Sequence, residues 1–71
     1  MEFNNQNFGK RLRDLRTDAG LTTLGLGQIL GVSDAAISRW ENGLQIIGAD
    51  NLHKIAKYFR VTTDYLLGME E

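Results

Sequence analysis

The stretch Thr23–Gly43, TLGLGQILGVSDAAISRWENG, decides how this chain folds. It holds two short runs in which apolar residues recur at helical spacing, and a tight break, Gly31–Ser33, separates them. The periodic apolar residues are Leu26, Ile29 and Leu30 in the first run, and Ile37 and Trp40 in the second. The pattern therefore predicts two short helices that meet across a tight turn.

The residues at the break are of the kinds that such a meeting requires. Gly27 lets the second helix approach the first, and Gly31 can adopt a positive φ at no steric cost. Val32 and Ile37 are expected to fill the angle between the helices, and Ser33 is a natural N-cap for the second. This arrangement is that of a helix-turn-helix, whose second helix enters the major groove of DNA.

The outward face of the second predicted helix supports this interpretation. With Ile37 and Trp40 turned inward, the outward residues are Asp34, Ala35, Ser38, Arg39 and Asn42. A face that meets only water more often carries Glu and Lys. These side chains are instead short or polar, with one arginine, so the helix can lie close to base edges.

At this point the sequence resembles a known family. Gly31–Ser33 (GVS) and Ile37–Gly43 (ISRWENG) are similar to the Cro and phage-repressor type of helix-turn-helix, also called the xenobiotic-response-element type. The similarity continues in Leu15-Arg16, Gly20–Thr22, Val61-Thr62 and Asp64–Gly68, so it covers nearly the whole chain after the first few residues. It implies an all-α, five-helix domain like that of lambda repressor. It also implies sequence-specific binding of double-stranded DNA as a transcriptional regulator, with a repressor favoured.

The resemblance assigns base-reading roles on the second helix of the motif. Asp34 and Ala35 match the positions with which the family reads bases. Asp34 can accept from cytosine N4, Ala35 can contact a thymine methyl, and Arg39 can bind guanine O6 and N7 together. Ser38 can reach a base or a phosphate. Alternatively, Asp34 only stabilises the helix N-terminus through the helix dipole, a role compatible with base reading.

The resemblance also implies contacts to the DNA backbone. Arg16 is expected to pair with Glu41 while facing a phosphate, which would clamp the first helix onto the recognition helix beside Trp40; the alternative is an ordinary surface arginine. The other residues expected at phosphates are Thr22, Thr23, Ser33 and Asn42. Two departures weaken these contacts. Thr23 stands where the family has glutamine, and the loop Leu44–Gly48 lacks the usual basic residue and proline.

The remaining helices follow from apolar spacing and capping residues. A first helix is expected from Asn7, its N-cap, to Gly20, with an apolar face of Phe8, Leu12, Leu15 and Ala19. Thr22 is the expected N-cap of the second helix, which Gly25 and Gly27 weaken by about 1 kcal/mol each. A fourth helix is expected over about Ala49–Phe59, with an apolar face of Leu52, Ile55, Ala56 and Phe59. Thr62 and Gly68 bound a short fifth helix, and one of Ile46 and Ile47 is expected in the core.

Length and composition fit one small domain. The chain has 71 residues, of which 42% are hydrophobic, so it can form a small core of modest stability. The expected division is a flexible arm at 1–6, the helix-turn-helix domain at 7–68 and an acidic tail at 69–71. There is no cysteine, no signal-peptide pattern and no apolar run near the ~20 residues of a membrane span. A cytoplasmic protein associated with the nucleoid is expected.

The charge balance argues against strong binding to nucleic acid. Net charge is −1 and the sequence pI is about 5.7, whereas nucleic-acid binders are usually basic. The basic residues near the N-terminus are Lys10, Arg11, Arg13 and Arg16. They form either a phosphate-binding edge or a solvated face with a Lys10–Asp14 pair. Few phosphate contacts, weak non-specific binding and a shallow salt dependence are expected.

Other function classes have less support. A protein-interaction module that kept the helix-turn-helix shape is the main alternative, favoured by the net acidity, Asp34, Thr23 and the uncharged loop 44–48. An enzyme is not expected, since no nucleophile–base pair or phosphate loop is visible. No cofactor or metal is expected, and His53 is expected to be exposed. The expected partners are a palindromic double-stranded operator and a second copy of the chain, bound weakly through Tyr58, Leu67 and Met69.

Overall fold

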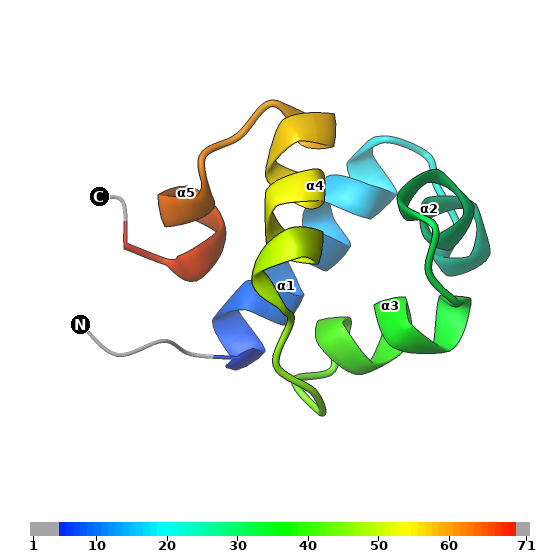
Figure 1. Cartoon of the computed structure of the whole chain (residues 1–71), viewed down its shortest axis with the longest axis horizontal. Helices are drawn as coiled ribbons and strands as arrows, with labels where there is room; N and C mark the ends of the chain where they lie inside the picture. Colours follow the sequence, from blue (N-terminus) through cyan, green and yellow to red (C-terminus); the bar gives the residue numbers. More distant parts are fainter. Residues whose placement is uncertain (1–4, 70–71) are drawn as a thin grey trace.

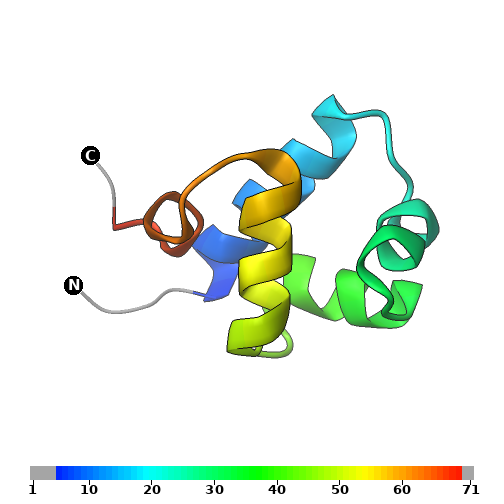
Figure 2. The ribbon, with the colours of Figure 1, turned by 45° about the horizontal axis from the view of Figure 1, so that its top comes forward.

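The computed structural model describes residues 5–69, which form five helices and no strand. The helices are α1 (Asn5–Asp18), α2 (Thr23–Leu30), α3 (Asp34–Glu41), α4 (Ala49–Phe59) and α5 (Thr63–Leu67). In Figures 1 and 2, α2 and α3 lie on one side of α4, and α5 lies on the other side. The predicted all-α, five-helix architecture is confirmed.

A single hydrophobic core joins all five helices. Its buried side chains are Phe8, Leu12, Leu26, Leu30, Ile37, Trp40, Ile47, Ile55, Ala56 and Leu66. Each helix is too short to be stable alone in water, so burial of these side chains supplies most of the stability of the helices. The packing of α3 against both α1 and α2 fixes the position of the recognition helix in the molecule.

Most predicted helix ends are confirmed. The hydroxyl groups of Thr22, Ser33 and Thr62 accept hydrogen bonds from the backbone N–H three residues later, at 2.9, 3.1 and 3.0 Å. At or just after the C-terminal ends of the helices, four glycines adopt a positive φ between 70° and 76°. They are Gly20, Gly31, Gly43 and Gly68. These caps satisfy backbone groups that the short helices leave without intrahelical partners.

Three expectations were wrong, and one detail of an open alternative is not observed. Helix α1 begins at Asn5, so Asn7 lies inside the helix and is not its N-cap. Ala19 follows the last residue of α1 and is exposed, and Ile29 is also exposed because Leu26 and Leu30 alone face the core. Within residues 5–69, Lys10 and Asp14 form no ion pair.

Other details follow the expectations. Helix α4 has the predicted bounds, and His53 on it is exposed. Of the two loop isoleucines, Ile47 is buried whereas Ile46 is 67% exposed. Residues 1–4 of the predicted arm and residues 70 and 71 of the predicted tail lie outside the described residues, and α1 includes residues 5 and 6. In the described part of the chain, no helix is long and apolar enough to cross a membrane.

Candidate nucleic-acid interface

The turn between α2 and α3 holds the two helices in close contact. Gly31 ends α2 with φ 76°, and the N–H of Val32 donates to the carbonyl of Gly27 at 2.8 Å. A Cβ on Gly27 would lie 2.6 Å from the carbonyl oxygen of Val32, which is too close for any side chain. Ile37 is fully buried and Val32 packs against the core. The roles predicted for these residues in the turn are confirmed.

Helix α3 separates a packing face from an outward face. Ile37, Trp40 and Glu41 are buried, whereas all four predicted base-reading residues, Asp34, Ala35, Ser38 and Arg39, are exposed. The whole segment from residue 17 to residue 53 contains one lysine or arginine, which is Arg39. The outward face can therefore approach bases with short side chains and one cation.

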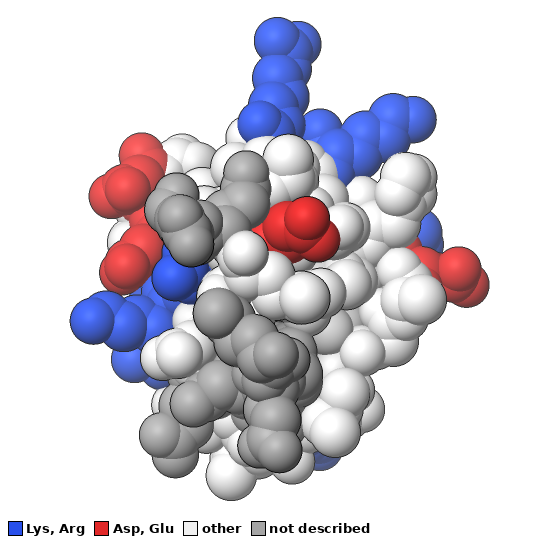
Figure 3. All heavy atoms as spheres, turned by 90° about the vertical axis from the view of Figure 1, so that its left-hand side faces the viewer, with Lys and Arg blue, Asp and Glu red and all other residues white. Residues whose placement is uncertain are grey.

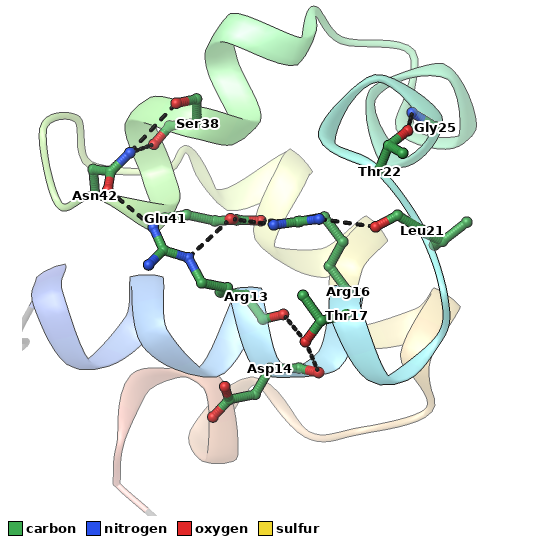
Figure 4. A network of polar contacts seen from close by, with 10 residues as sticks. All are labelled: Arg13, Asp14, Arg16, Thr17, Leu21, Thr22, Gly25, Ser38, Glu41 and Asn42. Carbon is green, nitrogen blue, oxygen red and sulfur yellow. Dashed lines mark hydrogen bonds and ion pairs between the residues drawn. The ribbon is translucent and has the colours of Figure 1, made fainter.

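An ion pair between Arg16 and Glu41 joins α1 to the end of α3 (Figure 4). Arg16 Nε lies 2.6 Å from Glu41 Oε2, and Arg16 Nη2 lies 3.0 Å from Glu41 Oε1. Arg16 Nη1 also donates to the carbonyl of Leu21 at 2.8 Å. The hydrogen bond to Glu41 raises the pKa of Arg16. Because the Glu41 side chain is only 2% exposed, its charge depends on this partner for compensation.

Arg13 extends this ion pair in a way that the sequence did not reveal. Its Nε lies 3.3 Å from Glu41 Oε1, and its Nη2 donates to Asn42 Oδ1 at 2.9 Å. Arg13 precedes Arg16 by three residues and so shares its face of α1, which was the available signal. One buried carboxylate therefore binds two arginines of α1. We call Arg13, Arg16, Glu41 and Asn42 the α1–α3 clamp.

The amide of Asn42 connects the clamp to the outward face of α3 (Figure 4). Its Nδ2 donates to the carbonyl oxygen of Ser38 at 2.8 Å and to Ser38 Oγ at 3.3 Å. Its Oδ1 accepts from Arg13, so both ends of the amide are engaged. Ser38 Oγ is thereby an acceptor for Asn42, and its own O–H stays available to donate outward.

Gly9 brings the backbones of α1 and α3 into direct contact. A Cβ at this position would meet the carbonyl oxygen of Glu41, and would lie 2.6 Å from that of Trp40 and 2.7 Å from the carbonyl carbon of Glu41. Any side chain here would push the two helices apart. Sequence reasoning missed Gly9, because a glycine inside a helix gives no sign of which helix it faces.

The other predicted phosphate contacts lie at helix N-termini. The hydroxyl oxygens of Thr22 and Ser33 accept from the backbone of α2 and α3, and their O–H groups remain able to donate to an anion. Thr23 is the first residue of α2 and is half-buried. The two helix dipoles favour negative charge at these ends.

The remaining cations of α1 have different surroundings. The guanidinium of Arg11 lies 4.8 Å from the ring centroid of Tyr65 on α5, and Lys10 is exposed. Of the four basic residues of α1, two thus belong to the clamp and a third contacts α5. The two arginines of the clamp also serve the structure.

These features agree with the comparison to known families. The helix-turn-helix family matches residues 12–66. This chain belongs to that family. The resemblance to the Cro and phage-repressor type is thus confirmed. Residues 12–66 include the turn, helix α3 and all four clamp residues.

The chain is similar to named regulators over almost all of its length. It is 44% identical over 64 residues to the HTH-type transcriptional activator BcrR of Enterococcus faecalis, covering 90% of this chain and 31% of that protein. It is 34% identical over 65 residues to the HTH-type transcriptional regulator ImmR of Bacillus subtilis (strain 168), covering 92% of this chain and 51% of that protein. The chain therefore spans about a third to a half of the length of these relatives.

A solved structure resembles the chain in full. The P22 c2 repressor, crystallised in complex with a synthetic operator, has a TM-score of 0.84 and 34% sequence identity. The similarity covers 92% of this chain and 98% of that chain. The described helices thus have the arrangement of a domain that has been crystallised on an operator.

Proposed function

We propose that this chain is a sequence-specific, double-stranded DNA-binding transcriptional regulator that acts as a repressor. One observation carries the proposal. The outward side chains of α3 are exposed, while the clamp and Gly9 fix the direction of that helix in the molecule. A recognition helix needs both properties, since it must fit the major groove in one orientation. Repression by occupying an operator requires nothing beyond such a domain.

We assign base reading to the outward residues of α3. Arg39 binds guanine through O6 and N7, and Asp34 accepts from cytosine N4. Ala35 contacts a thymine methyl, and Ser38 donates from its free hydroxyl hydrogen. This assignment is supported by their common exposure on one helix face.

We assign backbone contacts to Thr22, Thr23, Ser33 and Arg16. The hydroxyls of Thr22 and Ser33 retain a donor, as described above. Arg16 has two N–H groups that the described hydrogen bonds leave unused, but its side chain is only 14% exposed, so it reaches a phosphate at close range only. The sequence also predicted a phosphate contact for Asn42, whose amide hydrogens are already donated to Ser38.

We further propose a weak homodimer on a palindromic operator. Tyr58 and Met69 are 45% and 51% exposed, and Leu67 is partly buried. The face on the α5 side of the molecule shows scattered acidic and basic side chains beside uncharged surface (Figure 3). Two copies would place recognition helices in half-sites about one helical turn apart.

The setting proposed is the cytoplasm, at the nucleoid, and the proposed activity involves no catalysis.

A protein-interaction module is the second candidate. Leu44 and Ile46 are 77% and 67% exposed in the loop after α3, where the family usually carries a basic residue and a proline. An apolar loop beside the recognition helix suits a protein surface better than a phosphate backbone. This candidate predicts no measurable binding to duplex DNA at low salt.

Selection of sites from random duplex DNA tests the proposal. The folded protein should enrich a palindromic sequence, and Arg39→Ala should relax one guanine preference within it. Lys57→Ala removes a cation from the exposed side of α4 and should leave the enriched sequence unchanged, so it is the matched control. Absence of enrichment at low salt, from protein with a normal helical spectrum, would refute DNA binding by this chain and favour the interaction module.

A further inference from the structure

The end of α3 has a polar residue that is poorly suited to bind an anion. A side-chain amide has two N–H donors, and in Asn42 these go to the carbonyl oxygen and to Oγ of Ser38. The carbonyl oxygen of the same amide accepts from Arg13. The hydrogen-bonding capacity that remains on Asn42 is therefore acceptor capacity, which does not bind phosphate.

Arg13, which contacts Asn42, instead has hydrogen-bond donors that remain unused. A guanidinium has five N–H donors, and the described hydrogen bonds of Arg13 use its Nε–H and one hydrogen on Nη2. Within residues 5–69, Nη1 makes no hydrogen bond, so three donors remain. The side chain is 49% exposed, against 14% for Arg16. Arg13 is thus held in place at one edge and open to solvent at the other.

The surroundings of Arg13 give it room for a ligand. A surface hollow of about 460 Å³ lies between α1 and the end of α3, lined by Lys10, Arg13, Asp14, Glu41 and Asn42. The charged residues that line the hollow are the cations Lys10 and Arg13 and the carboxylates Asp14 and Glu41. The carboxylate of Glu41 is buried and is also compensated by Arg16, which does not line the hollow. Arg13 also lies within hydrogen-bonding distance of a residue that holds Ser38, so the hollow adjoins the outward face of α3.

We propose that Arg13 binds a phosphate of the DNA backbone and that Asn42 is a positioning residue. The inference rests on the proposed DNA binding and refines it. Asn42 holds the guanidinium of Arg13 on one side and the hydroxyl of Ser38 on the other. Arg13 therefore takes the phosphate contact that the sequence predicted for Asn42. The same arrangement links a phosphate contact to a base-reading side chain through one amide.

Salt dependence of binding tests the role of Arg13. Loss of one phosphate contact lowers the slope of log K against log salt by about 0.9, which is about a 3.5-fold change in relative affinity between 50 and 200 mM salt. Arg13→Gln removes the charge and keeps a donor for Glu41. Arg60→Gln makes the same change at an exposed residue that follows α4 and is not part of the clamp. The probe is a fluorescent duplex carrying the selected palindrome, or an arbitrary duplex if none is selected.

The expected result is a slope lowered by about 0.9 in Arg13→Gln and unchanged in Arg60→Gln. A change of affinity by the same factor at every salt concentration would overturn the proposal, because a purely structural role has that effect. If wild-type protein does not bind the duplex at all, the proposed DNA binding fails and this inference fails with it. Helical spectra and thermal melts of each variant show that folded protein was compared.

A second comparison tests the role of Asn42. If Asn42 acts only through Arg13 and Ser38, Asn42→Ala should weaken binding in the wild-type background. The same change should then have no further effect in a chain that already carries Arg13→Gln and Ser38→Ala. A residue that touches phosphate itself would still reduce affinity in that background, and such a reduction would refute the positioning role.

Discussion

Removal of Arg16 tests how far the clamp holds the fold together. The side chain of Glu41 is 2% exposed, and Arg16 supplies its two shorter hydrogen bonds, at 2.6 and 3.0 Å. Taking away one partner of a buried ion pair costs about 3–5 kcal/mol. Arg13 remains 3.3 Å from Glu41 and can compensate part of the charge, so Arg16→Met should lose about 3 kcal/mol.

This loss is large for so small a domain. At roughly 0.05–0.15 kcal/mol per residue, a chain of 71 residues has a free energy of unfolding of about 4–11 kcal/mol. Arg16→Met should therefore remove about a quarter or more of the stability. Urea unfolding at 25 °C measures the difference, and the single tryptophan, Trp40, reports it by fluorescence because it is 3% exposed in the fold.

Two further variants separate charge compensation from packing. Arg16→Met combined with Glu41→Leu replaces both charges by apolar groups and should recover most of the loss, since such replacements are often neutral or stabilising. Arg60→Met removes an exposed arginine and should change stability by less than about 0.5 kcal/mol. A loss below about 1 kcal/mol in Arg16→Met, or no recovery in the double variant, would show that Glu41 does not depend on Arg16.

Three other substitutions probe the rest of the fold. Gly9→Ala should destabilise the protein by about 1–3 kcal/mol in urea unfolding, because a Cβ cannot fit against the carbonyls of Trp40 and Glu41. Ser33→Ala should cost about 1 kcal/mol by the same method, because it removes the side-chain acceptor for the N–H of Ala36. Replacing Leu44 and Ile46 together by Ser and Thr should change stability by less than about 0.5 kcal/mol, since both are mostly exposed. The same replacement should lower any self-association through this exposed apolar loop, measured by sedimentation velocity.

Each of these has a result that would contradict it. A Gly9→Ala protein as stable as wild type would mean that α1 and α3 can separate without penalty. A Ser33→Ala protein with unchanged stability would mean that the cap is replaced by water. A loss of several kcal/mol on changing the two loop residues would mean that they are packed rather than exposed.

The fold could be predicted from local signals, and most of these were reliable. Thr22, Ser33, Thr62 and the glycines that stop helices each act within a few residues of their own position, so the sequence alone identifies them. The wrong predictions also concerned local features, such as a helix start and the exposure of one side chain. Asn7 has good capping chemistry, but α1 starts earlier, and Ile29 has helical spacing but is 45% exposed while Leu26 and Leu30 are buried.

The clamp required more than local signals. The pairing of Arg16 with Glu41 joins residues 25 positions apart, and it was expected only because the motif around them resembles a known family. Arg13 and Asn42 gave no such signal, because their contact depends on the angle and distance between α1 and α3. That distance is set partly by Gly9, whose importance is visible only when both helices are present.

The division of α3 into a packing face and an outward face has a consequence for how such a chain diversifies. Ile37, Trp40 and Glu41 are buried and hold the helix, whereas Asp34, Ala35 and Arg39 are exposed. Exchanging the latter three should redirect the protein to another DNA sequence without a new fold having to evolve. Ser38 is the exception, since Asn42 ties it to the clamp, so its replacement would also disturb the residue that holds Arg13. If these four residues read bases as proposed, target choice is separable from folding at three positions and coupled to it at the fourth.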